Sequence, residues 1–230
     1  MAGEHTIKAF DDEIAELRAL IAAMGGRAER AIARAIAALQ RGDEAEAASV
    51  VDEDRIIDRL EADIEALAVR IIALRAPMAD DLREVVAALK IAAVLERVGD
   101  YAKNIAKRVG VTRRDRQMEP ISVLPAMANA AADLVRDSLD AFAARDVDKA
   151  LDVCRRDAEV DDFYDSIFRA LVTHMIEHPQ TIGSAAHLLF VAKNLERIGD
   201  HATNVAEMVY FAATGDHLEE RERARGQARQ

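Results

Sequence analysis

A stretch of eighteen residues occurs twice in this chain, and the two copies begin one hundred positions apart. The first reads KIAAVLERVGDYAKNIAK from Lys90 to Lys107, and the second reads FVAKNLERIGDHATNVAE from Phe190 to Glu207. Solenoid repeats have a period of about 20–50 residues, so this spacing instead indicates two related halves of about domain size. The shared residues are also unusual for a helix core, because they include two acids, a base, a glycine and an amide.

The composition is typical of long helices. Among 230 residues there are only 4 prolines and 10 glycines and no tryptophan, while alanine, leucine, glutamate and arginine are abundant. The formal net charge is −11. A nucleic-acid partner needs a basic surface, so we expect no nucleic-acid binding. The negative charge is compatible with bound cations or with a basic protein surface.

Three features predict a cytoplasmic protein. Cys154 is the only cysteine, so no internal disulfide can form. The first residues, MAGEHTIKAFDDE, do not resemble a signal peptide. No stretch reaches the ~18 consecutive apolar residues of a membrane span. We therefore expect no direct membrane insertion, and membrane association only through a partner.

Apolar residues and helix breakers define three helices in the first half. A seam with steps of three and four begins at Phe10 and continues through Leu17, Ile21 and Met24. Gly42 and Asp43 predict the end of this helix and the N-cap of the next. The second helix repeats isoleucine and leucine every seven residues and ends near Pro77, and a third runs over about 78–109.

The second half repeats this pattern and predicts the fold class. Helices are expected over about 126–144, from Asp146 to about 177, and from there to a stop at Gly215. Short connections make successive helices antiparallel. We predict an all-α protein of two pseudo-symmetric antiparallel three-helix bundles, with six long helices. The predicted organisation is repeat 1 over 1–112, a linker over 113–125, repeat 2 over 126–215 and a mobile charged tail over 216–230.

Two clusters of acids coincide with the repeat. Side chains four apart lie on one face of a helix, and each half carries two such acidic pairs on its second and third helices. In both halves the two pairs lie about 19–21 residues from the intervening turn, so antiparallel helices place them at the same level. The first acid cluster comprises Asp54, Asp58, Glu96 and Asp100; the second comprises Asp157, Asp161, Glu196 and Asp200.

Such clusters suggest metal binding. Four carboxylates between helices cannot all remain ionised and buried without a cation, and acid-rich oxygen sites suit magnesium, calcium, manganese or iron. The ordinary alternative is a set of surface ion pairs with Arg55, Arg97, Arg156 and Arg197. Gly99 and Gly199 favour the metal reading: glycine inside a helix costs about 1 kcal/mol relative to alanine, which a close helix approach beside the acids would explain. Further residues that could support the ligands are Arg97, Asn104, Arg197, His201 and Asn204.

At the motifs LERVGD and LERIGD the chain resembles the PhoU family of bacterial regulators of phosphate uptake. The resemblance extends from about His5 to Gly215 and includes both aspartate pairs and the Pro77–Arg83 turn segment, which has no counterpart after Pro179. It implies two three-helix bundles, often assembled as homodimers, with metal ions such as iron, zinc, manganese or magnesium at the acid motifs. It also implies a non-enzymatic adaptor that contacts the ATP-binding subunit of the Pst phosphate transporter and the PhoR sensor kinase, and represses the phosphate-starvation response.

Two other functions are compatible with a helical bundle. A carboxylate-bridged di-iron enzyme uses Glu-x-x-His pairs, and none of the six histidines follows a glutamate at that spacing. A purely structural bundle, with the acids as a solvated face, would show the same melting temperature with and without divalent metal, because a ligand that binds only the native state must stabilise it.

Overall fold

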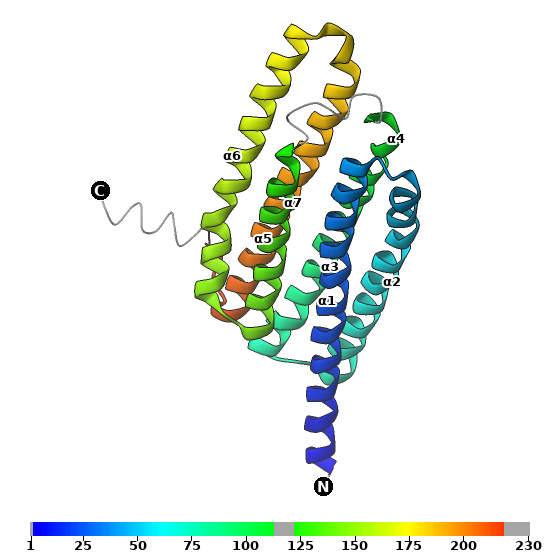
Figure 1. Cartoon of the computed structure of the whole chain (residues 1–230). Helices are drawn as coiled ribbons and strands as arrows, with labels where there is room; N and C mark the ends of the chain where they lie inside the picture. Colours follow the sequence, from blue (N-terminus) through cyan, green and yellow to red (C-terminus); the bar gives the residue numbers. More distant parts are fainter. Residues whose placement is uncertain (1, 113–121, 219–230) are drawn as a thin grey trace, which may run out of the picture.

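The computed structural model describes residues 2–112 and 122–218, with side chains from residue 9 onward. The described residues form six long helices, which run side by side in Figure 1. The predicted linker over 113–125 and charged tail over 216–230 lie mostly outside the described residues. The elements in chain order are α1 (Ala2–Arg41), α2 (Glu44–Arg75), α3 (Asp80–Ala106), α4 (Val109–Thr112), α5 (Leu124–Ala144), α6 (Val147–Glu177), the 3-10 turn η3 (Pro179–Thr181) and α7 (Ile182–Thr214).

The predicted breaks between the first two helices of each repeat are confirmed. Gly42 adopts a left-handed φ of 60°, and the Asp43 side chain accepts a hydrogen bond from the backbone N–H of Glu46 at 3.0 Å. Repeat 2 has the same joint: Arg145 adopts a φ of 53°, and Asp146 caps the backbone N–H of Lys149. A side chain that satisfies an otherwise unpaired N–H fixes the helix start.

The turns between the second and third helices differ in the two repeats. The bounds of α3 also differ from the predicted ones. That helix begins at Asp80 rather than near residue 78 and ends at Ala106 rather than near residue 109. Ala76 and Ala79, on either side of Pro77, both have positive φ, which delays the helix start. In repeat 2 a 3-10 turn begins at Pro179 itself. The predicted ends of α6 and α7 are confirmed, with Gly215 at a φ of 82°.

The helices pack as two bundles that share one core. Within each repeat the three long helices contact one another, and across the repeats α1 packs on α5 and α3 on α7 (Figure 1). The expected seam of α1 lies inside: Leu17, Ile21, Met24 and Ala28 are fully buried. Gly25 permits the α1–α5 contact, because a Cβ there would lie 2.1 Å from Leu139 Cδ1. The predicted fold class is confirmed.

The contact between α3 and α7 locates a pseudo-two-fold axis. Tyr101 and His201 occupy the same place in the repeat, and their rings stack with centroids 5.4 Å apart and an angle of 15° between planes. The His201 Nε2 atom and the Tyr101 hydroxyl are 3.3 Å apart. Equivalent residues of two-fold-related units contact each other only beside the axis. The axis therefore passes next to the third helices, one residue after Asp100 and Asp200.

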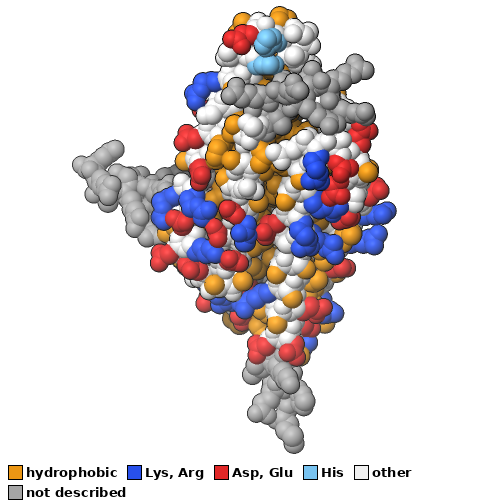
Figure 2. Space-filling model, viewed as in Figure 1, with side chains coloured by type: hydrophobic (Ala, Val, Ile, Leu, Met, Phe, Trp, Pro, Cys, Tyr) orange, Lys and Arg blue, Asp and Glu red, His pale blue; other side chains and the backbone are white. Residues whose placement is uncertain are grey.

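The surface is mixed in charge on the face that Figure 2 shows, where lysines and arginines alternate with acids over α1 and α5. Among the described helices, none is long and apolar enough to span a bilayer.

Candidate metal centre

The first acid cluster lies where α2 and α3 approach closely. Asp54 is buried, with 7% of its surface exposed. A Cβ on Gly99 would lie 3.2 Å from the Asp54 carboxylate and 2.9 Å from Ile57 Cδ1. Contacts of 3.0–3.4 Å are tighter than most real Cβ contacts. The glycine within α3 therefore allows the buried aspartate of α2 to approach the α3 backbone.

A lysine forms ion pairs with two carboxylates at the buried end of this cluster. The Lys103 ammonium forms ion pairs with Asp54 Oδ2 and Asp100 Oδ1. Burial raises the pKa of Asp54, and the hydrogen bond from Lys103 opposes that rise. Burial also acts to lower the pKa of Lys103, but its pairs with Asp100 and Asp54 outweigh burial and raise it. The two helices are thus joined by a charged bridge that offsets part of the negative charge at this end.

The open end of the first cluster contains an acid that the sequence analysis did not select. Burial raises the pKa of Glu96, and the neighbouring charges of Asp100, Glu61 and Asp58 raise it further. Burial likewise raises the pKa of Glu61, with contributions from Glu65 and Asp58. Glu61 follows Asp58 by three positions and lies on the same helical face, which is the signal that could have identified it.

In the second acid cluster the aspartate carboxylate lies even closer to the glycine of the neighbouring helix, and no lysine pairs with it among the described residues. A Cβ on Gly199 would lie only 2.6 Å from Asp157 Oδ1, a distance that real Cβ atoms essentially never show. That same oxygen is buried and has no hydrogen-bond partner. The pKa of Asp157 is raised from 3.8 to about 6, first by burial and then by the charges of Asp161, Asp200 and Glu196. All four predicted acids therefore act on one another electrostatically.

The lysine of the second cluster lies at the opposite end. Lys193 forms an ion pair with Glu196 Oε2. Its ammonium also lies 5.1 Å from the centre of the Tyr164 ring. Burial raises the pKa of Asp161 and of Asp200, and in both cases the Glu196 charge is the next cause. Asp157, Asp161 and Asp200 therefore have no ion-pair partner among the described residues.

The residues expected to support the ligands lie mostly at the pseudo-axis. The Asn204 amide is 3.1 Å from His201 Nδ1, and the Arg197 guanidinium lies 5.8 Å from the centre of the Tyr101 ring of the other repeat. Burial lowers the pKa of His201, and the positive charges of Arg97 and Arg197 lower it further. Asn104 is half-buried. The lowered pKa favours the neutral form of His201.

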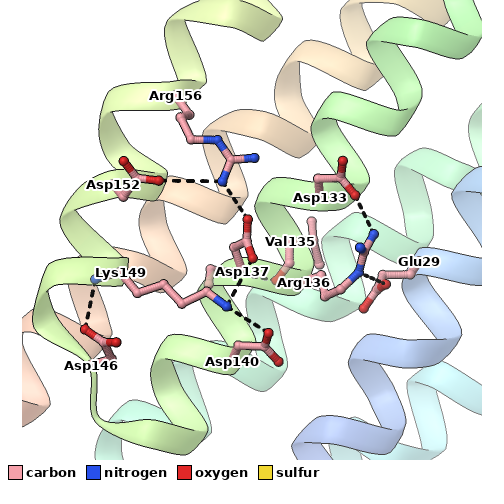
Figure 3. A network of polar contacts seen from close by, with 11 residues as sticks. Glu29, Asp133, Val135, Arg136, Asp137, Asp140, Asp146, Lys149, Asp152 and Arg156 are labelled. Carbon is pink, nitrogen blue, oxygen red and sulfur yellow. Dashed lines mark hydrogen bonds and ion pairs between the residues drawn. The ribbon is translucent and has the colours of Figure 1, made fainter.

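Arg156 does not form the ion pair with the cluster acids that the alternative to metal binding predicted. Its guanidinium contacts Asp137 at 2.6 Å and Asp152 at 3.7 Å, in a network that joins α5 and α6 (Figure 3). In the same view Arg136 of α5 reaches Glu29 of α1 at 3.2 Å. These pairs stabilise helix packing. Among the described residues, the direct cationic partners of the acid clusters are the two lysines, each three residues along its helix from a cluster acid.

The carboxylates fit a cation only in part as they stand. Within 2–112 and 122–218, no three acidic, histidine or cysteine side chains converge as a completed metal site. Like charges separate when no cation holds them together. The second cluster nevertheless has the features of a cation site: a buried carboxylate oxygen without a partner, and a glycine that clears space beside it. Aspartate and glutamate oxygens suit hard divalent or trivalent ions.

Comparisons with known proteins match the repeat organisation. The family model for the PhoU domain matches residues 21–109 and again residues 124–209. A "Phosphate-specific transport system accessory protein PhoU homolog" of Zymomonas mobilis is 53% identical over 221 residues, which cover 96% of this chain and 93% of that relative. A Caulobacter vibrioides protein of the same name is 49% identical and covers 94% of each chain.

Solved structures have the same fold. The crystal structure of PhoU from Pseudomonas aeruginosa superposes with a TM-score of 0.85 at 35% identity, over 90% of this chain and all of the other. The phosphate transport system regulatory protein PhoU from Streptococcus pneumoniae also gives 0.85, at 26% identity, over 91% of this chain and 99% of that one. With the family model matched in both repeats and relatives similar over nearly the whole length, the chain belongs to the PhoU family.

Proposed function

We propose that this chain is a negative regulator of phosphate uptake and of phosphate-starvation signalling. It would act as a metal-binding adaptor between the ATP-binding subunit of a Pst-type transporter and a PhoR-type sensor kinase. The observation that carries the proposal is similarity over nearly the whole chain to proteins named as accessory to phosphate-specific transport. The Streptococcus pneumoniae structure is likewise named a regulatory protein.

An adaptor rather than an enzyme agrees with those names, since the relatives are called accessory or regulatory proteins. The di-iron alternative still lacks its Glu-x-x-His pairs. A cytoplasmic location, assembly as a homodimer and membrane association through the transporter remain predictions that accompany the proposal.

The acid clusters would hold the metal ions. In repeat 2 the ligands would be Asp157, Asp161, Glu196 and Asp200, and in repeat 1 they would be Asp54, Asp58, Glu96 and Asp100. A bound ion would supply positive charge between two helices that otherwise bring like charges together. The protein's own contribution is placement: Gly99 and Gly199 let the carboxylates of α2 and α6 approach the neighbouring helix. Iron, zinc, manganese and magnesium are the candidate ions.

Elemental analysis tests the metal-binding part. The protein would be purified without an affinity tag, beside a variant with Glu96, Asp100, Glu196 and Asp200 all changed to alanine. We expect stoichiometric metal in the parent and none in the variant. Equal trace metal in both would refute metal binding while leaving the regulatory role in place.

Gene replacement tests the regulatory part. Deleting the gene is expected to switch on a phosphate-starvation reporter in high phosphate, and the intact gene is expected to silence it. Co-purification with the transporter's ATP-binding subunit and with the kinase would identify the partners. A deletion strain with normal reporter repression would refute the proposed role.

A further inference from the structure

We infer that Lys103 is a built-in competitor for the metal, so that the second acid cluster binds an ion first and the first cluster does so only when Lys103 is displaced. The inference rests on the proposed metal binding and assigns a regulatory role to a residue outside the acid motifs. It follows from the different positions of Lys103 and Lys193, the lysines that pair with the two acid clusters.

In repeat 1 the ammonium already occupies the place of a cation. Lys103 contacts both Asp54 on α2 and Asp100 on α3, the two helices that a metal ion would also join. Its side chain is 23% exposed and that of Asp54 is 7% exposed. Charge-assisted hydrogen bonds in such partly buried places are stronger than those on the surface. An incoming ion must therefore break two contacts before it can use these two carboxylates.

In repeat 2 the corresponding position carries no charge. Thr203 stands one hundred residues after Lys103, and its hydroxyl donates a hydrogen bond to the backbone carbonyl of Asp200 at 2.7 Å. The hydroxyl is therefore paired with its own helix rather than with the α6 aspartates. Asp157, the counterpart of Asp54, has no ion-pair partner among the described residues, and its Oδ1 atom is buried without a hydrogen bond. An ion that binds this carboxylate therefore has no lysine to displace from it.

Lys193 does not close the second cluster in the same way. It pairs with Glu196 alone and lies against the Tyr164 ring. Asp157, Asp161 and Asp200 retain no ion pair among the described residues. Repeat 1 has the reverse arrangement, since position 93 is alanine and position 61 is glutamate where repeat 2 has Lys193 and Tyr164. Among the described residues, each acid cluster thus pairs with one lysine, and of the two lysines Lys103 is the one that bridges two helices at the buried end.

The test exchanges the two residues and measures manganese binding. Wild type, K103T, T203K and the double exchange would be stripped of metal and titrated with Mn²⁺, with free Mn²⁺ followed by electron paramagnetic resonance. The matched changes Asp58→Asn and Asp161→Asn assign each binding class to its cluster, because the two residues are equivalent and neither is ion-paired among the described residues. Circular dichroism and the Mn²⁺-dependent shift in melting temperature provide a second readout.

We expect two classes of sites in wild type, with the class sensitive to Asp161→Asn tighter by about tenfold or more, the ratio that loss of a charge-assisted hydrogen bond can produce. K103T should strengthen the class sensitive to Asp58→Asn to within about threefold of the other. T203K should weaken the class sensitive to Asp161→Asn by about tenfold. If K103T does not fold, T203K still tests the inference, because it adds a lysine and removes no ion pair.

Each contrary result has a distinct meaning. If wild type binds two ions equally tightly, or if neither exchange changes the isotherm, the competitor role of Lys103 is wrong while metal binding stands. If no variant, wild type included, binds Mn²⁺ or gains thermal stability from it, both metal binding and the role of Lys103 are refuted.

Discussion

The acid cluster of repeat 1 is bridged by a lysine of its own helix, whereas that of repeat 2 leaves its most buried aspartate oxygen without a partner. The helices, the acid spacing and the close-approach glycine are the same in both. At the buried end the difference is one position on the third helix, Lys103 or Thr203. Two repeats with the same helices therefore need not have the same charge balance. A single side chain three residues from a cluster acid can change it.

The largest expected difference concerns the two lysines. Lys103→Met removes the bridge between α2 and α3 and leaves Asp54 as an unpaired buried charge, so the metal-free protein should lose about 2–3 kcal/mol of unfolding free energy. Lys193→Met removes one half-exposed pair and should cost about 1 kcal/mol or less. Urea denaturation of both variants measures the two values. Equal losses would show that the lysines play equivalent roles.

The glycines offer a second comparison. Gly199→Ala places a Cβ 2.6 Å from the Asp157 carboxylate, so the cost of displacing that side chain should exceed the gain in helix propensity. We expect a net loss of about 2 kcal/mol in thermal or urea unfolding. Gly183→Ala is the matched control on α7, because nothing lies within 4 Å of the added Cβ. The control should be neutral or slightly stabilising, and a stabilised Gly199→Ala would contradict the close approach.

Asp157 of repeat 2 should make a large contribution to the pH dependence of stability. The pKa of Asp157 is raised from 3.8 to about 6 in the folded chain, so between these values the folded state binds more protons than the unfolded state. The stability of the metal-free protein should therefore fall as the pH rises through this window, by about 1 kcal/mol after allowance for solvent exposure. Asp157→Asn should remove that slope and stabilise the metal-free protein above pH 6.

Melting curves from pH 4.5 to 7.5 for wild type and Asp157→Asn provide the test, with Asp52→Asn as an exposed aspartate control on α2. The other titrating acids contribute to both curves, so only the difference between them matters. A difference that does not vary with pH would show that Asp157 titrates as an ordinary exposed aspartate.

The smallest expected effect concerns the pseudo-axis. Tyr101→Phe keeps the ring stack on His201 but removes the hydroxyl at 3.3 Å from Nε2, a long contact whose loss should cost about 0.5 kcal/mol. Tyr101→Ala also removes the stack and should cost distinctly more. Thermal unfolding compares the two. Equal losses would mean that the hydroxyl contact, and not ring stacking, holds the repeats together here.

Much of the fold was predictable because it depends on local chemistry. Gly42 with Asp43, and the stop at Gly215, follow from backbone conformation and capping, which nearby residues determine. The level placement of the acid pairs follows from equal rise per residue in antiparallel helices. Glycine beside the acids correctly indicated a close helix approach.

The remaining features depend on contacts that helix periodicity does not describe. The choice of Lys103, and not Arg97, as the partner of Asp54 depends on side-chain reach and burial at the α2–α3 contact. The stack of Tyr101 on His201 depends on where the pseudo-axis runs, which no pattern within one repeat contains. The late start of α3 reflects two alanines with positive φ, a conformation that alanine rarely adopts.

The Tyr101–His201 contact also has an evolutionary consequence. If two single-repeat chains were to pair as these repeats do, one residue would face its own copy at this point, and every substitution would change both sides of the contact at once. In a fused chain each side can change alone. A symmetric dimer of identical single repeats cannot pair a tyrosine with a histidine at its axis. In the fused chain this position can carry two different residues, which symmetry would exclude.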